Sequence, residues 1–381
     1  MTEGRIYRRL GDYIKEYSVK NKAGEDIPVY SVTNSQGFCK EYFSKEVASQ
    51  DKTSYKIVPY GCFAYNPSRI NVGSIDWQHK EEKVIVSPLY NVFCVSEGIL
   101  QSYLLYFLKS PATIKFIDTI ATGTVRLNLK LSMLKDFTLH IPSIPIQRAI
   151  VSELDKINEL LLIKKSQLHD IDVLSLSIFY DMFGDTMENE KRWEMKKLKE
   201  IGKILTGNTP SRSVPDYYDS NYIEWIKTDN IIKNQLYATE AKEYLSPKGA
   251  NCGRIVNEGS LLVACIAGSI DSIGKACVTN RRVAFNQQIN AIVPNDSINV
   301  LFLYYLVMSI KGTIQKNAST GMKHILTKSV MEDIAVPLPP LALQQSFAAR
   351  ITAIEQEKLQ INASIKDLET LLASRMQFWF D

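Results

Sequence analysis

Two long stretches of the chain, residues 146–183 and 341–381, lack glycine and proline and carry apolar side chains at alternating steps of four and three. This spacing gathers the apolar side chains into one narrow stripe of a helix, the pattern of a coiled-coil seam. The predicted seam residues are Ile150, Leu154, Ile157, Leu161, Leu168 and Ile171 in the first stretch, and Phe347, Ile351, Ile354, Ile361, Ile365, Leu368 and Leu372 in the second. Prolines just before each stretch suit a helix start.

The two stripes share one register, because subtracting 197 from the second superimposes it on the first. A helix of this length, on the order of 55–60 Å, cannot bury so narrow a stripe by itself. We therefore expect the two helices to pack on each other as an antiparallel pair related by a pseudo-twofold axis, with a globular domain at each end. The alternative is two unrelated amphipathic helices, each packed on its own domain, which leaves the shared register unexplained.

The remaining segments repeat as well. Leu105-Tyr-Phe-Leu returns as Leu303-Tyr-Tyr-Leu at a shift of 198, and Gly61 returns as Gly259 at the same shift. The expected organisation is a first domain over residues 1–140, a long helix over 141–185, a second domain over 186–336 and a second long helix over 337–381. Both domains mix short β-rich pieces with helical ones, so the predicted class is mixed α/β (α+β) with an internal repeat.

Composition adds limits to this picture. The chain has 381 residues, enough for two domains with their own cores, and its net charge of +4 is too small to indicate nucleic-acid binding by itself. The six cysteines are scattered without a metal-binding spacing, so we expect reduced, mostly buried thiols. We find no signal core and no apolar stretch long enough for a membrane span, which makes the cytoplasm the expected location.

Several strings suggest catalysis but fail on spacing. The segment from Gly268 to Ala276 resembles a phosphate-binding loop, yet it has one residue too many and alanine in place of the hydroxyl residue, so a glycine-rich turn between strands is the simpler interpretation. Tyr65-Asn-Pro-Ser lacks the second proline and the aromatic residue of an amino-methyltransferase motif. Glu224 and Lys227 are spaced so that they point to opposite faces of a strand, unlike a nuclease pair. We therefore predict neither a catalytic site nor a metal site.

Four segments in register with the duplication resemble the conserved and recognition regions of type I restriction-modification specificity subunits. They are the two proline-rich segments with the helices that follow them, Phe63-Ala-Tyr-Asn-Pro-Ser-Arg in the first half, and Leu205-Thr-Gly-Asn-Thr-Pro-Ser with Trp225-Ile-Lys-Thr-Asp-Asn in the second. The resemblance covers nearly the whole chain, in the order domain, helix, domain, helix.

The resemblance implies that each domain reads one half of an asymmetric, bipartite site in double-stranded DNA. It further implies that the helix pair acts as a spacer and docks two methyltransferase subunits. Restriction-translocase subunits would join where the system contains them. S-adenosylmethionine, ATP and Mg would then belong to partner subunits, and this chain would bind no cofactor and catalyse nothing.

Candidate DNA-contacting residues are polar side chains beside glycine or proline, or in the Thr-Gly segments, where a backbone can approach DNA closely. They are Asn66, Arg69, Arg126, Thr209, Ser211, Arg212, Lys227, Thr228, Asp229, Asn230, Lys323 and His324. For each, an ordinary solvated loop residue is an equal alternative. We expect Tyr65 and Trp225 to be core aromatics and not platforms for base stacking.

Two other functions remain open from the sequence. A non-enzymatic interaction scaffold, dimerised by its coiled coil, agrees with the modest net charge. A stand-alone DNA methyltransferase would need a cofactor-binding motif, which we do not find in this sequence.

Overall fold

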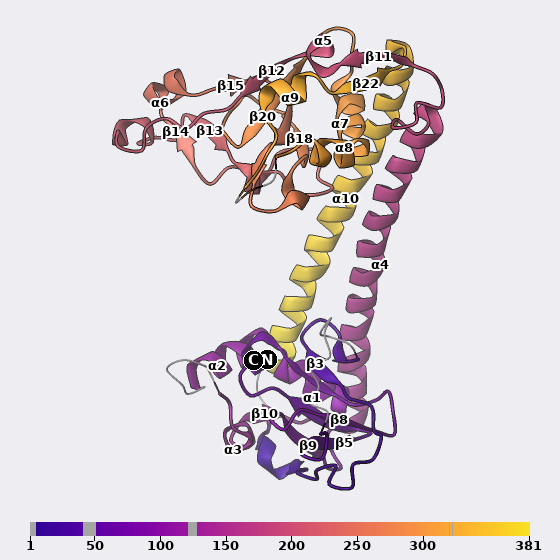
Figure 1. The fold of residues 1–381 in the computed structure, drawn as a ribbon. Coiled ribbons are helices and arrows are strands. Elements are labelled where there is room, and N and C mark those ends of the chain that lie inside the picture. The colour runs from indigo at the N-terminus through magenta and orange to yellow at the C-terminus, as the bar shows by residue number, and fades with distance from the viewer. Residues whose placement is uncertain (1–4, 41–50, 121–127, 320, 322) are drawn as a thin grey trace. The chain divides into compact units, whose positions relative to one another are not determined.

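The computed structural model describes residues 5–40, 51–120, 128–319, 321 and 323–381. It divides into two compact units, one formed by Met1–Lys165 with Ala363–Asp381 and the other by Ser166–Asn362 (Figure 1). Each unit contains one mixed helix-and-strand domain together with half of each of two long helices. The predicted mixed α/β class with two long helices is therefore confirmed.

Each unit is built on an antiparallel four-stranded sheet of the same topology. In the first unit the strand order is β2-β9-β6-β7, with β2 at Ile14–Glu16, β9 at Asn91–Val95, β6 at Cys62–Tyr65 and β7 at Ile75–Trp77. In the second unit the order is β12-β20-β16-β18, with β12 at Gly202–Thr206, β20 at Ile289–Pro294, β16 at Leu261–Ala264 and β18 at Ala276–Val278. The repeat seen in the sequence is thus a repeat of the sheet.

The turns that precede β6 and β16 contain equivalent glycines, which shows the duplication at the level of single residues. Gly61 and Gly259 both have left-handed backbones, with φ of 82° and 77°. Their N–H groups donate equivalent 2.7 Å hydrogen bonds, from Gly61 to the carbonyl of Gln78 and from Gly259 to that of Thr279. Glycine adopts this backbone without the strain that a Cβ would cause, which explains why it recurs at both places.

Helices and strand pairs around the two sheets also correspond. In the first unit β1 (Tyr7–Arg9) pairs with β10 (Thr138–His140), and the helices are α1 (Gln101–Leu108), α2 (Pro111–Ile120) and α3 (Leu131–Lys135). In the second unit β11 (Glu194–Lys197) pairs with β22 (Ala335–Leu338), and the matching helices are α7 (Val300–Ser309), α8 (Lys311–Lys316) and α9 (Lys328–Glu332). One core cluster of the first unit contains Phe63 and Phe93, whose rings stack 5.0 Å apart.

The rest of each domain differs between the units. The first unit adds the pairs β3 (Ser31–Thr33) with β4 (Gly37–Cys39) and β5 (Lys56–Pro59) with β8 (Lys83–Val86). The second unit adds α5 (Leu198–Ile201), α6 (Pro247–Cys252), the strand pair β17 (Ile266–Ala267) with β21 (His324–Ile325), and a second sheet of order β14-β13-β19-β15. The strands of that sheet are β13 (Ile223–Ile226), β14 (Tyr244–Leu245), β15 (Ile255–Val256) and β19 (Val283–Phe285).

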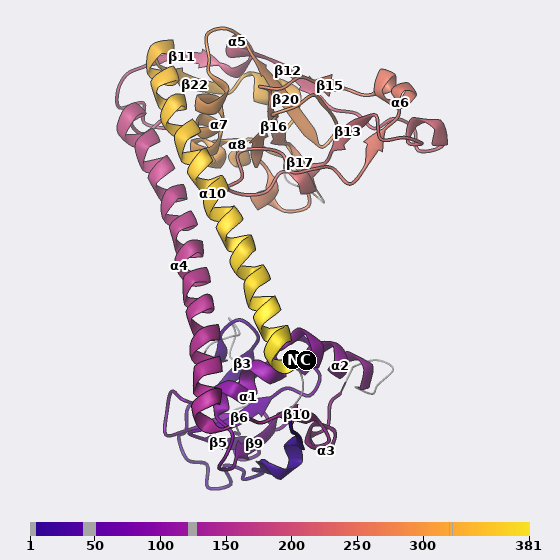
Figure 2. The same cartoon turned by 180° about the vertical axis from the view of Figure 1, so that it is seen from behind.

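The long helices are α4 (Ile144–Phe183) and α10 (Leu341–Phe380), which Figure 2 shows from behind. In the first unit Met376 shares a core cluster with Leu154, and Arg375 forms an ion pair with Glu153. In the second unit Phe179 packs against Phe347, with ring centroids 5.6 Å apart. In each unit the early part of one helix therefore lies beside the late part of the other, which is an antiparallel pairing.

Burial follows the predicted stripe along both helices. The side chains of Ile150, Leu154, Ile157, Leu161, Ile351, Ile354, Ile361 and Ile365 are buried, and those of Leu168 and Leu368 are half-buried. Lys358, which interrupts the second stripe, is kept there by ion pairs to Asp172 at 2.6 Å and to Glu355 at 2.9 Å. The apolar stripe thus tolerates this lysine because two carboxylates neutralise it.

The expectation of six reduced thiols is wrong for one pair. Cys62 and Cys94 lie directly opposite each other on β6 and β9 and form a disulfide. Two residues in register on neighbouring strands are close enough for this bond, but the pairing of β6 with β9 is a tertiary feature that spacing along the chain does not reveal. Cys39, Cys252, Cys265 and Cys277 are free.

Candidate nucleic-acid interface

The loop after β12, residues 207–212, is fixed by a close backbone approach. Gly207 donates a 3.0 Å hydrogen bond to the carbonyl of Ile289, and Asn208 donates one of 3.1 Å to that of Phe285. A Cβ on Gly207 would lie 2.1 Å from the backbone oxygen of Asn286, so only glycine fits. The glycine of the Thr-Gly-Asn-Thr-Pro-Ser string is therefore needed for the close packing of this loop against the Asn286 backbone. This packing positions the polar residues that follow.

The Asn208 side chain anchors the same loop to a neighbouring segment. Its Nδ2 donates to the Cys252 carbonyl and its Oδ1 accepts from the Arg254 N–H, each at 2.6 Å. The Asn208 carbonyl in turn accepts a 3.3 Å bond from Nε1 of Trp225. Trp225 is only 3% exposed, as expected for a core aromatic, and Tyr65 in the first unit is fully buried.

Arg212, Tyr218, Trp225, Lys227 and Glu243 come together as one group, named here the Arg212 cluster. The Arg212 guanidinium lies 4.4 Å from the ring centre of Tyr218 and 5.1 Å from that of Trp225. Both Arg212 and Lys227 form ion pairs with Glu243. The Lys227 hydrogen bond, and then that of Arg212, hold the pKa of the Glu243 carboxyl below its usual range, so it is ionised at neutral pH. Arg212 and Lys227, two cationic candidates from separate segments of the sequence, thus share one carboxylate.

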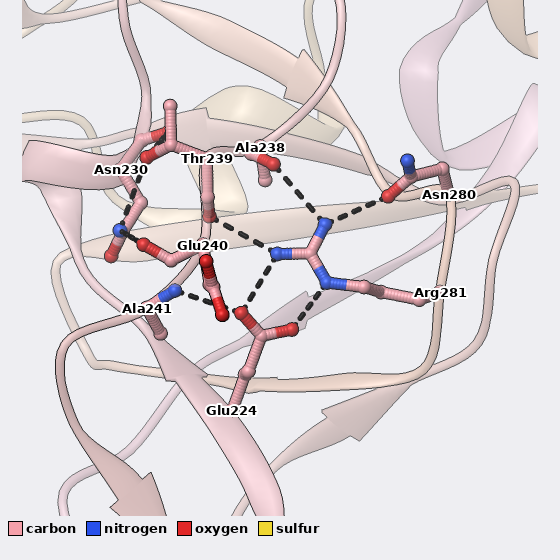
Figure 3. A network of polar contacts seen from close by, with 8 residues as sticks. All are labelled: Glu224, Asn230, Ala238, Thr239, Glu240, Ala241, Asn280 and Arg281. Carbon is pink, nitrogen blue, oxygen red and sulfur yellow. Dashed lines mark hydrogen bonds and ion pairs between the residues drawn. The ribbon is translucent and has the colours of Figure 1, made fainter.

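Arg281 and Glu224 hold the segment of residues 238–241 through hydrogen bonds (Figure 3). Arg281 binds Glu224 through Nε and Nη2 and also donates to the carbonyls of Ala238 and Thr239, at 3.2 Å and 3.1 Å. Glu224 accepts a further 2.8 Å bond from the N–H of Ala241. The bond from Arg281 lowers the pKa of the Glu224 carboxyl against the opposing effect of burial. These residues therefore fix the course of the chain, and Glu224 has no nuclease-like pairing with Lys227.

Asn230 does not reach the surface. Its side chain is 5% exposed, accepts from the N–H of Lys227 at 3.0 Å, and donates to Thr239 Oγ1 and the Glu240 carbonyl. A buried amide with its hydrogen bonds satisfied internally is not available to a base edge, so the prediction that Asn230 contacts DNA is corrected: it shapes the loop that carries Thr228 and Asp229. Asp229 is exposed and Thr228 half-buried.

A turn between β19 and β20 contacts Thr209 and the start of β17, the strand paired with β21. Thr209 donates its hydroxyl to Oε1 of Gln287, and the carbonyl of Gln288 accepts from the N–H groups of Cys265 and Ile266. Ile266 begins β17, which pairs with the strand that contains His324. Gln287, Gln288, Tyr218 and Glu243 are not among the candidates that the sequence singled out. The run Asn286-Gln-Gln between two β-rich pieces is the one signal that was available, because amides suit readout of adenine.

Two other candidates of the second unit, Ser211 and Lys323, are exposed loop residues, whereas His324 lies in β21. Ser211 shares a 2.7 Å hydrogen bond with Ser213, and Lys323 is exposed next to β21. His324 is half-buried, and its Nδ1 atom finds no hydrogen-bond partner among the described residues. These residues remain predictions as DNA contacts.

In the first unit Asn66 and Arg69 lie in the tight loop between β6 and β7. Oδ1 of Asn66 accepts from the N–H of Ser68 at 3.0 Å, the N–H of Arg69 donates to the Asn66 carbonyl at 3.0 Å, and Arg69 is exposed. Asn66 therefore shapes the loop that presents Arg69. Arg126 lies outside the described residues.

The strings that suggested catalysis have structural roles. The segment from Gly268 to Ala276 joins β17 to β18 through a 3-10 turn, Ile270–Ser272, and no α-helix follows Lys275 as a phosphate-binding loop requires. Burial raises the pKa of the Cys265 and Cys277 thiols to about 12, which makes them poor nucleophiles.

Among the described residues, no three His, Cys, Asp or Glu side chains are grouped to hold a metal ion, and no helix there is long and apolar enough to cross a bilayer.

Comparison with known proteins agrees with the duplicated fold. The family model for the type I restriction modification DNA specificity domain matches twice, over residues 10–172 and 190–370. The HindI specificity subunit of Haemophilus influenzae is 29% identical over 192 residues, which is 48% of this chain and 40% of that protein. The MjaIX specificity subunit of Methanocaldococcus jannaschii is 22% identical over 297 residues, 71% of this chain and 67% of that protein.

Solved structures share the fold. One solved structure concerns the complex assembly and conformational transition of the type I R-M system. It has a TM-score of 0.61 at 16% identity, and the match covers 99% of this chain and 97% of that chain. The type I restriction-modification S subunit from M. genitalium has a TM-score of 0.56 at 14% identity, over 100% of this chain and 98% of that one. With a DNA specificity domain in each half, the chain belongs to the family of type I restriction-modification specificity subunits.

Proposed function

We propose that this chain is the non-catalytic DNA-reading subunit of a type I restriction-modification complex, and that each domain reads one half of an asymmetric, bipartite double-stranded site. The observation that carries the proposal is one sheet topology built twice, β2-β9-β6-β7 and β12-β20-β16-β18, with different side chains on the loops around it. Equivalent frameworks approach equivalent places on DNA, whereas different loops read different bases.

The candidates differ between the halves as this proposal requires. The first domain offers the exposed Arg69 in the loop between β6 and β7, whereas the second offers the Arg212 cluster and the Gln287-Gln288 turn. Arginine and glutamine are side chains that make paired hydrogen bonds to guanine and adenine, respectively, in the major groove. The two half-sites should therefore differ in sequence.

The long helices offer a surface for partner subunits. Although the stripe between the helices is buried, α4 also exposes large apolar side chains on its other faces: Leu160, Leu162, Ile163, Val173, Leu174 and Leu176, with Leu162 being 71% exposed. Exposed apolar side chains in such numbers favour contact with another protein. We infer that two methyltransferase subunits dock there, with restriction-translocase subunits joining where the system contains them.

The catalytic reactions of the complex are then carried out by the partner subunits. In the proposed complex S-adenosylmethionine binds the methyltransferase subunits, ATP and Mg serve the translocase, and this chain binds double-stranded DNA and no cofactor. The complex would work in the cytoplasm, where the chromosomal DNA of a bacterium or archaeon is located.

The test is single-molecule sequencing of genomic DNA from cells with and without this gene. We expect a split adenine-methylation motif that disappears when the gene is deleted and returns on complementation. A substitution in the first domain should alter one half of the motif and a substitution in the second domain the other half. Methylation that is unchanged by deletion would reject the proposal in favour of a scaffold role.

A further inference from the structure

The Arg212 cluster presents a hydrogen-bond donor and an acceptor side by side. The Arg212 side chain is 54% exposed and that of Glu243 34% exposed, and the two are joined by an ion pair from Nη2 to Oε2. Arginine has five N–H donors and each carboxylate oxygen two lone pairs, so the pair keeps capacity for a ligand. The described contacts of Arg212 with other residues use its Nη2 and the face of its guanidinium.

We propose that Arg212 and Glu243 together read one G·C base pair in the half-site of the second domain. Arg212 donates to O6 and N7 of the guanine, and Glu243 accepts from the N4 amino group of the paired cytosine. This assignment rests on the proposed function, and it adds which residues of the second domain specify a base and which base pair they take.

The charge of the cluster favours a base edge over a phosphate. Glu243 already neutralises one of the two cations, Arg212 and Lys227, that contact it. A phosphate placed against Arg212 would lie next to the carboxylate and be repelled, whereas the neutral acceptors of guanine would not. The cytosine amino group donates a hydrogen bond to the same carboxylate. The Glu243 side chain therefore weakens the binding of a phosphate and favours the binding of a base pair.

The cluster is also held rigidly, as base reading requires. Arg212 stacks on Tyr218, whose hydroxyl donates to the Pro210 carbonyl at 2.7 Å, and on Trp225. The backbone of Glu243 is tied to β13 by a 3.0 Å bond from the N–H of Trp225 to its carbonyl. A guanidinium that is already ordered loses less side-chain entropy when it binds a base.

Another ion pair of the same domain, Lys248 with Asp216, differs from the Arg212 cluster in its surroundings. Lys248 and Asp216 lie 2.8 Å apart with 70% and 58% of their side chains exposed. Lys248 makes no cation–π contact among the described residues, and no second cation pairs with Asp216 there. This pair resembles an ordinary surface ion pair, and it supplies a matched control.

The experiment compares Arg212→Lys, Glu243→Gln and the control Asp216→Asn in the assembled complex. The methylation motif of each is read by single-molecule sequencing, and binding is measured on duplexes substituted at every position of the wild-type motif. Lysine keeps the positive charge but loses the paired donors, so a phosphate contact would survive Arg212→Lys and a base contact would not. We expect both variants to relax the same G·C position, in one half only, with its preference falling roughly ten-fold or more. Asp216→Asn should leave the motif intact.

Four results would overturn the assignment. They are an equal loss of affinity on all duplexes, relaxation at an A·T position, relaxation at different positions in the two variants, and a motif unchanged by either. Retained reading of the other half-site shows that a variant complex is folded. A wild-type complex with no split motif would instead remove the proposed function itself, so the two failures are distinguishable.

Discussion

Gln147 and Gln344, separated by 197 positions, make the same three hydrogen bonds in the two units. Oε1 of Gln147 accepts from the N–H of Leu100, and its Nε2 donates to the carbonyls of Gly98 and Pro142, each at 2.8 Å. Oε1 of Gln344 accepts from the N–H of Asn299 at 2.9 Å, and its Nε2 donates to the carbonyls of Ser297 and Pro339. Each glutamine therefore joins the start of its long helix to the segment before α1 or α7.

The first prediction concerns these two glutamines. Gln147→Ala or Gln344→Ala removes the three hydrogen bonds of a fully buried side chain and leaves partly buried backbone groups without partners, so it should lower the free energy of unfolding by about 1–3 kcal/mol. Urea unfolding followed by circular dichroism measures the change. The exposed neighbour Gln345 is the control, since Gln345→Ala should cost less than about 0.5 kcal/mol. Equal stability of all three variants would contradict the joining role.

A second prediction separates the buried stripe from the exposed faces of α4. Leu154 is fully buried, so Leu154→Asp should cost about 3 kcal/mol or more and disrupt the helix pair, and Ile354→Asp should act in the same way. Leu162 is exposed, so Leu162→Asp should leave unfolding unchanged but weaken methyltransferase docking. Size-exclusion chromatography of the mixed subunits measures docking. Intact complex with Leu162→Asp would argue against that face as the docking surface.

The third prediction tests the close approach at Gly207. In Gly207→Ala the methyl group would overlap the Asn286 backbone, so we expect displacement of residues 207–212, a stability loss of about 1–3 kcal/mol and weaker DNA binding. Gly312 in α8 has open space around its Cβ position, and Gly312→Ala should be neutral or slightly stabilising. Unfolding and DNA titrations of both variants decide the matter, and unaltered binding in Gly207→Ala would remove this loop from the interface.

A fourth prediction concerns the two cations that the sequence singled out first. Arg69→Ala or Lys227→Ala should weaken binding to the cognate duplex by about 1–3 kcal/mol if the side chain reads a base, and should relax one position of the motif. If the side chain binds a phosphate instead, affinity falls on all sequences alike and the salt dependence becomes shallower. Titrations at two salt concentrations distinguish these outcomes, and unchanged affinity and preference would exclude both residues.

The fifth prediction follows from the lowered pKa of Glu224 beside Arg281. A carboxyl whose pKa is lower in the folded state stabilises the protein above its unfolded pKa, about 4.3, and this stabilisation is lost as the pH falls through the folded pKa. Glu224→Gln should therefore destabilise the domain by about 1–3 kcal/mol at pH 7, and the difference from the wild type should shrink below about pH 4. Thermal unfolding between pH 3 and about pH 8 measures the difference, and a pH-independent gap would contradict the ionic role.

The sequence by itself determined the duplication, the two long helices and which of their faces is buried. A heptad spacing specifies the buried stripe directly, because residues three and four apart share a helix face whatever else surrounds them. The shift of 197 that superimposes the two apolar stripes also relates Gln147 to Gln344, although it does not show what these side chains bind. Local patterns likewise showed that the phosphate-loop-like string lacks the spacing for its chemistry.

Only the tertiary structure decided which distant residues meet. The disulfide of Cys62 with Cys94 depends on the pairing of β6 with β9, and Glu243 reaches Arg212 and Lys227 because Arg281 fixes the segment before it. Burial likewise removed Asn230 from the DNA candidates. Contacts of this kind arise when sheets close and loops fold back, so they depend on long-range strand pairing, which local periodicity does not encode.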